Sequence, residues 1–303
     1  MIKRLSEIVE EAKKGKTMTL SVACGEDPHT IEAVGRGVRE GIVKATLIGN
    51  KSKIERVSKE HNLDPQAFEV MDEPNEEKAL KLAVRLVKQK ERDFLMKGLV
   101  DTSKYMRVIL DKENGLLPAG KILSHVTVVE FPLHPKLLIV SDVAVIPKPD
   151  LPAKIAMTNY CIEVAHSLGI ERPKVGIIAA VEKVNLKMDE TLDAAVISKM
   201  AERDQIKGAI VDGPLALDTA VSKESCEIKG LKSSVDGDAD VLVFPNIETA
   251  NVFFKTCTQL AGGEIAGVVA GTEVPCILTS RADSEDSKFY SIALGAVLAG
   301  GLK

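Results

Sequence analysis

The sequence predicts an α/β protein with two domains, each built on a mostly parallel sheet flanked by helices. Short apolar runs alternate with segments of helical periodicity through most of the chain, which is typical of such sheets. The 303 residues suggest about two domains on the usual size range. A hydrophobic content of 45% supplies enough apolar side chains for one or two full cores.

The first half of the chain shows the alternation clearly. Strands are predicted at 17–24, 45–49 and 94–100, and helices at 30–40, 50–61, 75–90 and 101–110. Around 121–146 the rhythm changes, because KILSHVTVVEFP and KLLIVSDVAVI are β-rich runs without a long helix between them. We expect a crossing between domains, or an extension of the sheet, at this point.

Alternation resumes in the second half. Helices are predicted at 151–168, 190–202, 247–261 and 285–299, and strands at 175–181, 208–211, 240–244 and 275–279. The last strand and helix could return to the first domain. The pattern of residues does not by itself establish that return.

Composition excludes several classes of partner. The net charge of -4 provides no general attraction to nucleic acid or membrane. The chain lacks Trp and has three Tyr, so platforms for base stacking are not expected. Five cysteines without a CxxC pair argue against a disulfide framework and for the reducing cytoplasm. The charged N-terminus does not resemble a signal peptide, and no stretch of about 18 apolar residues predicts a membrane span.

Several common catalytic and cofactor motifs are absent from the sequence. There is no HExxH or His/Cys spacing for zinc, and no GxSxG nucleophile turn. No GxGxxG loop follows the first predicted strand, and no Walker A motif occurs. We therefore expect no metal and no permanently bound cofactor.

Polar residues collect where predicted strands end, which is where ligands bind in open parallel sheets. Thr102 and Ser103 follow the strand at 94–100, Asn246 follows the strand at 240–244, and Ser280 follows the last strand. Among the arginines, only Arg107 and Arg281 lie within a few residues of such an end. A guanidinium group binds phosphate or carboxylate through two parallel hydrogen bonds, so an anion site is plausible here.

Each of these residues also has a structural explanation. An arginine after a strand often forms a surface salt bridge. Ser280 could be a turn residue, and Asn246 has the chemistry of a helix N-cap. Arg36 and the other arginines in helical patterns are expected on solvated faces.

The chain resembles the phosphate acetyl/butyryltransferase family over nearly its whole length, most closely the butyryl type. The resemblance rests on ordered blocks that include GEDPHTIEAV, VDGPLALDTAVS, ADVLVFPNIETAN and LAGGEIAGVVAGTEVPCILTSRADSEDSK. It implies reversible acyl transfer from butyryl-CoA to inorganic phosphate, giving butyryl phosphate and free coenzyme A. Coenzyme A and phosphate are then substrates, and a homodimer or higher homo-oligomer is implied.

The resemblance also implies an architecture. Relatives have two α/β domains of the isocitrate/isopropylmalate dehydrogenase type, with the active site in the interdomain cleft. Carried over, the first domain comprises 1–130 plus 278–303, and the second comprises 131–277.

Residue by residue, the resemblance places the catalytic Ser-Arg pair on Ser280 and Arg281. The nearby acidic residue falls on Asp286, although Asp283 or Glu285 could match because the loop here is one residue shorter than in many acetyltransferases. The second anion-binding arginine falls on Arg107, whose segment DTSKYMR departs from the usual acetyltransferase version.

Three other functions compete with this interpretation. The nearest is phosphate acetyltransferase, which performs the same chemistry on a smaller acyl group. An NAD- and metal-dependent dehydrogenase on the same architecture would need a carboxylate cluster, which the sequence does not show convincingly. A catalytically silent coenzyme A-binding module is the third.

Overall fold

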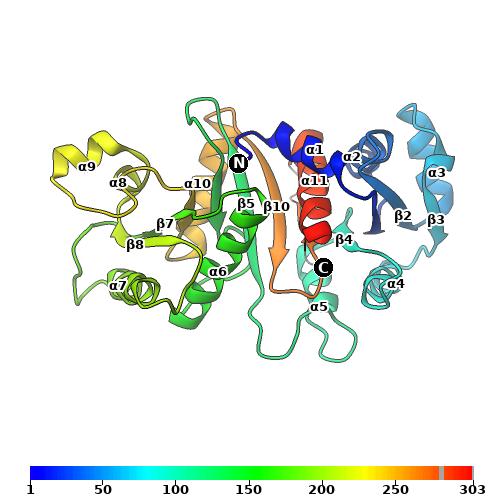
Figure 1. The fold of residues 1–303 in the computed structure, drawn as a ribbon. Helices are drawn as coiled ribbons and strands as arrows, with labels where there is room; N and C mark the ends of the chain where they lie inside the picture. The colour runs from blue at the N-terminus through cyan, green and yellow to red at the C-terminus, as the bar shows by residue number, and fades with distance from the viewer. Residues whose placement is uncertain (280–282, 302–303) are drawn as a thin grey trace. The chain divides into compact units, whose positions relative to one another are not determined.

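The computed structural model describes residues 1–279 and 283–301, which form two compact units (Figure 1). One unit consists of Met1–Arg4 and Ser124–Glu264 and is called the middle unit, because it holds the middle of the sequence. The other consists of Leu5–Leu123 and Ile265–Lys303 and is called the outer unit, because it holds most of the two outer parts of the sequence. The units divide the chain near 123 and 264, whereas the sequence analysis places its domain boundaries at 130 and 277. The domain division itself stays a prediction.

The outer unit contains a mostly parallel sheet in the order β3-β2-β1-β4-β11-β10. Strands β1 to β4 and β11 are parallel to one another, whereas β10 is antiparallel to β11. The strands are β1 (Met18–Ala23), β2 (Val43–Gly49), β3 (Glu69–Asp72), β4 (Phe94–Lys97), β10 (Glu264–Ala270) and β11 (Cys276–Ile277). The C-terminal strand β11 therefore lies directly beside β4.

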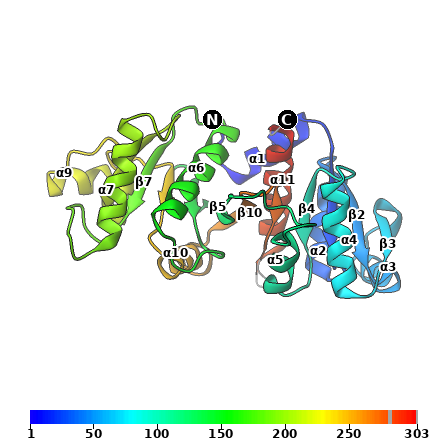
Figure 2. The same cartoon turned by 90° about the horizontal axis from the view of Figure 1, so that it is seen from below.

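Helices connect these strands and cover the sheet. They are α1 (Leu5–Lys14), α2 (Pro28–Arg39), α3 (Lys51–Glu60), α4 (Glu76–Lys88), α5 (Thr102–Ile109) and α11 (Glu285–Gly301). Right-handed crossovers place α2 and α3 on one face and α4 on the other, because the chain reverses its direction across the sheet after β3. Helix α11 packs against α1 and α2, while α5 packs against α4 (Figures 1 and 2).

Helix α11 is buried nearly all round, as its Ala-, Gly- and Leu-rich sequence predicts. Gly295 allows close packing on β4, because a Cβ atom there would lie 2.9 Å from Cε2 of Phe94. On another side, Oγ of Ser291 accepts a hydrogen bond of 2.9 Å from the backbone N–H of Gly267 in β10. The helix thereby contributes to the core of the outer unit.

The strands of the middle unit are arranged in the order β5-β6-β9-β7-β8. Strands β5 and β6 are antiparallel, and the remaining neighbours are parallel. The strands are β5 (Ser124–Glu130), β6 (Leu138–Ser141), β7 (Lys174–Ile178), β8 (Ile210–Leu215) and β9 (Val241–Val243). The helices are α6 (Leu151–Ser167), α7 (Asp189–Glu202), α8 (Leu217–Val221), α9 (Lys223–Lys229) and α10 (Ile247–Gln259).

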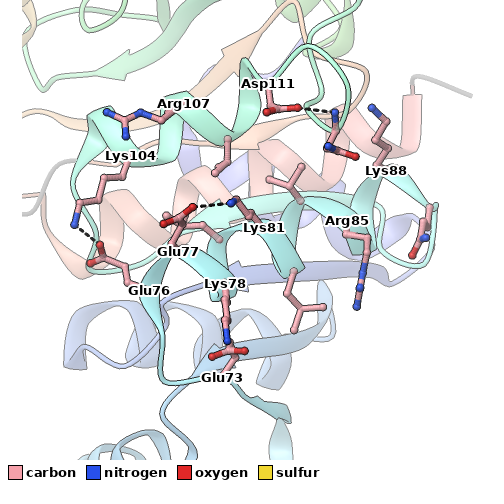
Figure 3. Close-up of a pocket in the computed structure, with 16 residues that line it drawn as sticks. Glu73, Glu76, Glu77, Lys78, Lys81, Arg85, Lys88, Lys104, Arg107 and Asp111 are labelled. Atoms are coloured by element: carbon pink, nitrogen blue, oxygen red, sulfur yellow. Dashed lines mark hydrogen bonds and ion pairs between the residues drawn. The ribbon is translucent and has the colours of Figure 1, made fainter.

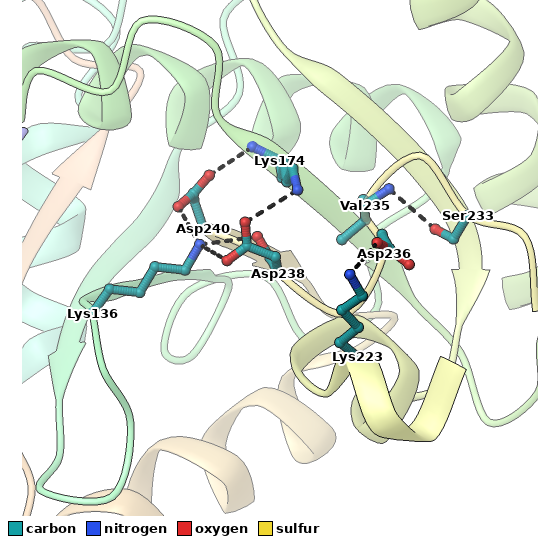
Figure 4. Close-up of polar contacts among 8 residues, drawn as sticks. All are labelled: Lys136, Lys174, Lys223, Ser233, Val235, Asp236, Asp238 and Asp240. Atoms are coloured by element: carbon teal, nitrogen blue, oxygen red, sulfur yellow. Dashed lines mark hydrogen bonds and ion pairs between the residues drawn. The ribbon is translucent and has the colours of Figure 1, made fainter. Parts of the chain in front are cut away.

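Ion pairs fasten the amino ends of three strands in the middle unit (Figure 4). Asp240 precedes β9; its Oδ1 lies 2.6 Å from Nζ of Lys136, and its Oδ2 accepts a hydrogen bond of 2.8 Å from the backbone N–H of Lys174. Asp238 pairs with the same two lysines, at 2.7 and 3.1 Å. Burial would raise the pKa of Asp238, but hydrogen bonds from Lys136 and Lys174 outweigh it and hold this pKa below its usual range.

Two strands were missed by the sequence analysis. Residues 69–72 form the edge strand β3, whose polar Glu69 and Asp72 hide the apolar signal of a strand. Residues 264–270 form β10, whose alanine and glycine residues have low strand propensity. The predicted strand at 275–279 is shorter, since only Cys276 and Ile277 pair.

Within residues 1–279 and 283–301, no helix combines the length and the apolar character needed to cross a bilayer.

Replacing Asp240 with Ala should lower the free energy of unfolding by about 2–3 kcal/mol, because the ammonium group of Lys136 and the backbone N–H of Lys174 lose a buried acceptor. Urea unfolding followed by circular dichroism measures the change. Asp236→Asn is the matched control, since about half of the Asp236 side chain is exposed, its carboxylate lies 3.9 Å from Lys223, and asparagine tolerates its φ of 53° (Figure 4). We expect the control to change stability by less than about 0.5 kcal/mol. Equal effects of the two substitutions would contradict the anchoring role of Asp240.

Candidate active site

The candidate site of the outer unit lies at the carboxyl edge of its sheet, where parallel strands place the loops that bind ligands. Strand β1 ends there in Ala23, with Cys24 directly after it, and β4 ends in Lys97. The loop after β4 leads into α5, which carries Thr102, Ser103 and Arg107. Three of the predicted substrate-binding residues are thus brought onto one short helix.

The β4–α5 loop, residues 98–101, is docked tightly on the end of β1. Gly98 N donates to the carbonyl of Ala23 at 2.8 Å, and Leu99 N donates to that of Cys24 at 3.0 Å. A Cβ atom at Gly98 would lie 2.1 Å from the carbonyl oxygen of Cys24, so only glycine fits. Cys24 itself has a φ of 55°, an uncommon value for a residue other than glycine. The loop position is therefore set by the backbone of β1.

The first turn of α5 offers donors to an anion. Thr102 and Ser103 are its first two residues, both exposed, and their backbone N–H groups donate to no residue that the structure describes. Free N–H groups at a helix N-terminus favour negative charge. Ser103 and Arg107 are four residues apart, so they lie on the same face of the helix. The geometry suits a phosphate group.

Arg107 lies in a groove between α4 and α5 of about 950 Å³ (Figure 3). Six basic and four acidic residues line the groove: Lys78, Lys81, Arg85, Lys88, Lys104 and Arg107, with Glu73, Glu76, Glu77 and Asp111. Within residues 1–279 and 283–301, Arg107 has no ion pair, which leaves its guanidinium group available to a ligand.

Unlike Arg107, two lysines of the groove form ion pairs with carboxylates. Lys104 Nζ lies 2.5 Å from Glu76, and Lys81 Nζ lies 2.6 Å from Glu77 (Figure 3). The hydrogen bond to Glu76 raises the pKa of Lys104, and the hydrogen bond from Lys81 lowers the pKa of Glu77. Both shifts favour the charged forms, the ammonium group of Lys104 and the carboxylate of Glu77.

Asp286, the predicted base, lies in the first turn of α11 and forms an ion pair. Its Oδ1 is 2.5 Å from Nη1 of Arg36, and about half of its side chain is exposed. The guanidinium carbon of Arg36 also lies 3.9 Å from the centre of the Phe289 ring. Arg36 keeps about a third of its side chain exposed, as expected for a solvated face, but it is also paired, because the folded chain brings α2 and α11 together. Spacing along the sequence carried no signal of this contact.

The other two acidic candidates have different surroundings. Glu285 is the first residue of α11 and forms no ion pair with a described residue. The carbonyl of Asp283 accepts a hydrogen bond of 2.8 Å from the buried Lys288. Burial lowers the pKa of Lys288, and the charges of Asp283 and Asp27 oppose that effect. Asp27 Oδ2 is buried and receives no hydrogen bond from the described part of the chain.

Ser280 and Arg281 lie outside the described residues. Asn246 belongs to the middle unit, where it caps α10: its Oδ1 accepts a hydrogen bond of 3.0 Å from the backbone N–H of Thr249. This capping bond is the structural alternative that the sequence analysis left open for Asn246. Sequence reasoning also passed over Lys97, although a lysine within the apolar run FLMKGLV is a usable signal.

The thiols of the chain are poor nucleophiles. All five cysteines are buried. Burial raises the pKa of Cys24 and of Cys276 to about 12, and that of Cys257 to about 11. Burial likewise raises the pKa of Cys161 and of Cys226. Among the residues that the structure places, no three His, Cys, Asp or Glu side chains group as metal ligands.

Comparison with known proteins gives the site its context. The family model "Phosphate acetyl/butaryl transferase" matches residues 4–85 and 73–296. A phosphate butyryltransferase of Clostridium acetobutylicum is 45% identical over 300 residues, covering 99% of both chains. A phosphate acetyltransferase of Thermotoga maritima is also 45% identical, over 97% of this chain and 99% of its own.

A solved structure agrees with these similarities. The branched-chain phosphotransacylase from Enterococcus faecalis superimposes with a TM-score of 0.81 at 30% identity, covering 93% of this chain and 99% of that one. Agreement in sequence and in fold over nearly the whole length leaves one conclusion. The chain belongs to the phosphate acetyl/butyryl transferase family, and it is a phosphate acyltransferase.

Proposed function

We propose that this enzyme transfers a butyryl group from butyryl-CoA to inorganic phosphate, giving butyryl phosphate and coenzyme A, and that the reaction is reversible. The observation that carries the proposal is helix α5 at the carboxyl edge of the sheet, where Thr102 and Ser103 present free donors in the first turn and Arg107 presents its guanidinium group one turn later. A dianionic phosphate suits such donors. Asn246 is proposed as a further contact to substrate, in addition to its capping role.

We further propose the architecture of the isocitrate/isopropylmalate dehydrogenase type, with the active site in the cleft between two domains. In this arrangement Ser280 and Arg281 contribute to the site from the segment before α11. A homodimer or higher homo-oligomer in the cytoplasm completes the proposal.

Direct transfer is the simplest mechanism. An oxygen of phosphate attacks the thioester carbon, the carbonyl oxygen gains negative charge, and the C–S bond then breaks. Arg281 holds the phosphate and offsets its charge, while Ser280 donates to the developing oxyanion or to a phosphate oxygen. Arg107 is the second phosphate clamp. The attacking hydrogen phosphate gives up its proton, and the departing sulfur takes one to become the thiol of coenzyme A.

Asp286 is proposed as the group that exchanges this proton. Arg36 binds Oδ1, and Oδ2 has no hydrogen bond from a described residue, so Oδ2 is the oxygen proposed to exchange the proton. In the reverse direction, coenzyme A attacks butyryl phosphate and its thiol loses this proton. An ordinary aspartate has a pKa of about 4 and a thiol has a pKa of about 8.5, so full proton transfer from thiol to carboxylate costs about 6 kcal/mol. Transfer concerted with carbon–sulfur bond formation, or a thiol pKa lowered by the cations of the site, removes most of that cost.

Acetyl-CoA is the alternative substrate, supported by the equal identity to an acetyltransferase and a butyryltransferase. Apolar pockets distinguish substrates by about 1–3 kcal/mol per methylene group, so some use of both is expected.

Purified enzyme should release thiol from butyryl-CoA only when phosphate is present, with kcat/KM above that for acetyl-CoA. The difference should exceed about tenfold, since two methylene groups separate the substrates. Thiol detection across acetyl-, propionyl-, butyryl-, isobutyryl- and isovaleryl-CoA measures it. A maximum at acetyl-CoA would favour the alternative, and release that is independent of phosphate would reject the proposal.

Arg281→Ala should reduce kcat by about 10²–10³-fold, because the attacking phosphate loses the group that holds it and offsets its charge. Arg107→Ala should instead raise KM for phosphate about 10–100-fold, which corresponds to one lost charge-assisted contact. Arg85→Ala is the matched control, because Arg85 lies in the same groove on α4 (Figure 3). Normal kinetics of Arg281→Ala, or equal effects of Arg107→Ala and Arg85→Ala, would refute these roles.

Butyryl-CoA without phosphate should leave the mass of the native protein unchanged. Thiols with a pKa near 11 or 12 are ionised to less than about one part in 10² at pH 9, so none should carry the acyl group. Iodoacetamide should likewise label the native protein slowly and should label it fully in guanidinium chloride. An acylated residue that forms and decays at the rate of turnover would overturn direct transfer.

A further inference from the structure

Lys97 is a buried lysine at the carboxyl end of a core strand. It is the last residue of β4, only 3% of it is exposed, and Phe94, Leu95 and Met96 before it are fully buried. Burying an ammonium group costs free energy unless hydrogen bonds replace its water. The position of Lys97 at the edge where ligands bind raises the question of what it does.

The ammonium group holds the β4–α5 loop. Lys97 Nζ donates to the carbonyl of Gly98 at 3.2 Å and to that of Val100 at 3.0 Å. The N–H groups of Gly98 and Leu99 are bound by the end of β1, as described above. The loop is therefore held through its carbonyl groups on one side and through its N–H groups on the other.

This loop decides where α5 begins. Val100 directly precedes Asp101, the N-cap residue, and the exposed Thr102 and Ser103 follow. Because the side chain of Asp101 makes no capping hydrogen bond, the first turn depends on the loop for its placement. A shift of the Val100 carbonyl would move both hydroxyl groups.

The charge of Lys97 also reaches this edge of the sheet. Burial raises the pKa of Cys24, and the neighbouring charges of Lys97 and Lys104 act in the opposite direction. A charge in the protein interior acts more strongly over a given distance than one in water. An anion at the start of α5 would therefore be attracted by Lys97 even without direct contact.

We propose that Lys97 is a positioning residue for phosphate. It holds the β4–α5 loop so that the first turn of α5 is placed to receive phosphate, and its positive charge raises the affinity of that turn for the anion. The inference rests on the proposed function. It predicts that a substitution which removes the charge of Lys97 raises the KM for phosphate and leaves the KM for the acyl-CoA nearly unchanged.

Lys97→Met keeps the length and apolar stem of the side chain but removes the charge and the donors. We expect KM for phosphate to rise about tenfold, the effect of one interior charge near the anion. KM for butyryl-CoA should stay within about twofold of wild type, and Lys97→Arg should keep KM for phosphate within about threefold because it retains the charge. Steady-state kinetics with each substrate varied in turn separates these effects.

Lys88→Met is the matched control, because Lys88 Nζ also binds two loop carbonyls, those of Glu113 and Gly115, at 2.7 and 3.0 Å. That loop follows α5 instead of preceding it. Because Lys88 also lines the groove that holds Arg107, the control should leave KM for butyryl-CoA unchanged and should raise KM for phosphate less than Lys97→Met does. A second measurement does not require turnover: phosphate should raise the Tm of wild type and Lys88→Met, and raise it less for Lys97→Met. This readout separates a failure of the inference from a failure of the proposed acyl transfer.

Three outcomes would overturn the proposal: an unchanged KM for phosphate in Lys97→Met, equal losses for phosphate and butyryl-CoA, or a Lys97→Arg variant as impaired as Lys97→Met. Should Lys97→Met fail to fold, Lys97→Gln replaces it with the same expectations, since it also lacks the charge. If neither variant reaches the circular dichroism spectrum of wild type, Lys97 serves the fold and the proposal falls.

Discussion

The close approach of Gly98 to the carbonyl oxygen of Cys24 is the constraint on which the outer unit's candidate site depends. Backbone meets backbone there, and even a methyl group would lie 2.1 Å from that oxygen. The approach lets two N–H groups of the β4–α5 loop bind the end of β1. The loop is then an extension of the sheet edge, and α5 starts from a rigid base instead of a free connection.

Much of the fold could be predicted from the sequence, because long amphipathic helices and apolar strands have strong periodic signals. Helices α4 and α10 are examples. The edge strand β3 and the alanine- and glycine-containing β10 carry weak local signals, and their pairing with neighbouring strands stabilises them. Local pattern cannot show such pairing, since the partner lies elsewhere in the chain.

The same reasoning explains what sequence could tell about the site. Arg107 was singled out because its position after a strand is a local feature, and in the structure it has no described carboxylate partner. The pairing of Arg36 with Asp286 joins residues 250 positions apart, so it follows from the packing of α2 on α11 and from nothing local. Lys97 is recognisable in the sequence as a charged residue within an apolar run. Its proposed role, however, depends on the carbonyl groups that its side chain binds, and the sequence does not show these.

Electrostatics narrows how anionic substrates are recognised. The net charge of -4 gives no long-range attraction to phosphate or coenzyme A, and salt screens charges beyond about 8 Å under physiological conditions. Recognition must therefore come from short-range contacts. The groove beside α5 has two more basic than acidic residues, six against four, but its carboxylates bind Lys81 and Lys104. Selective binding of anionic substrates then depends on cations that the fold holds in place. The rigidity of the β4–α5 loop is therefore as important for this binding as the number of charges around the loop.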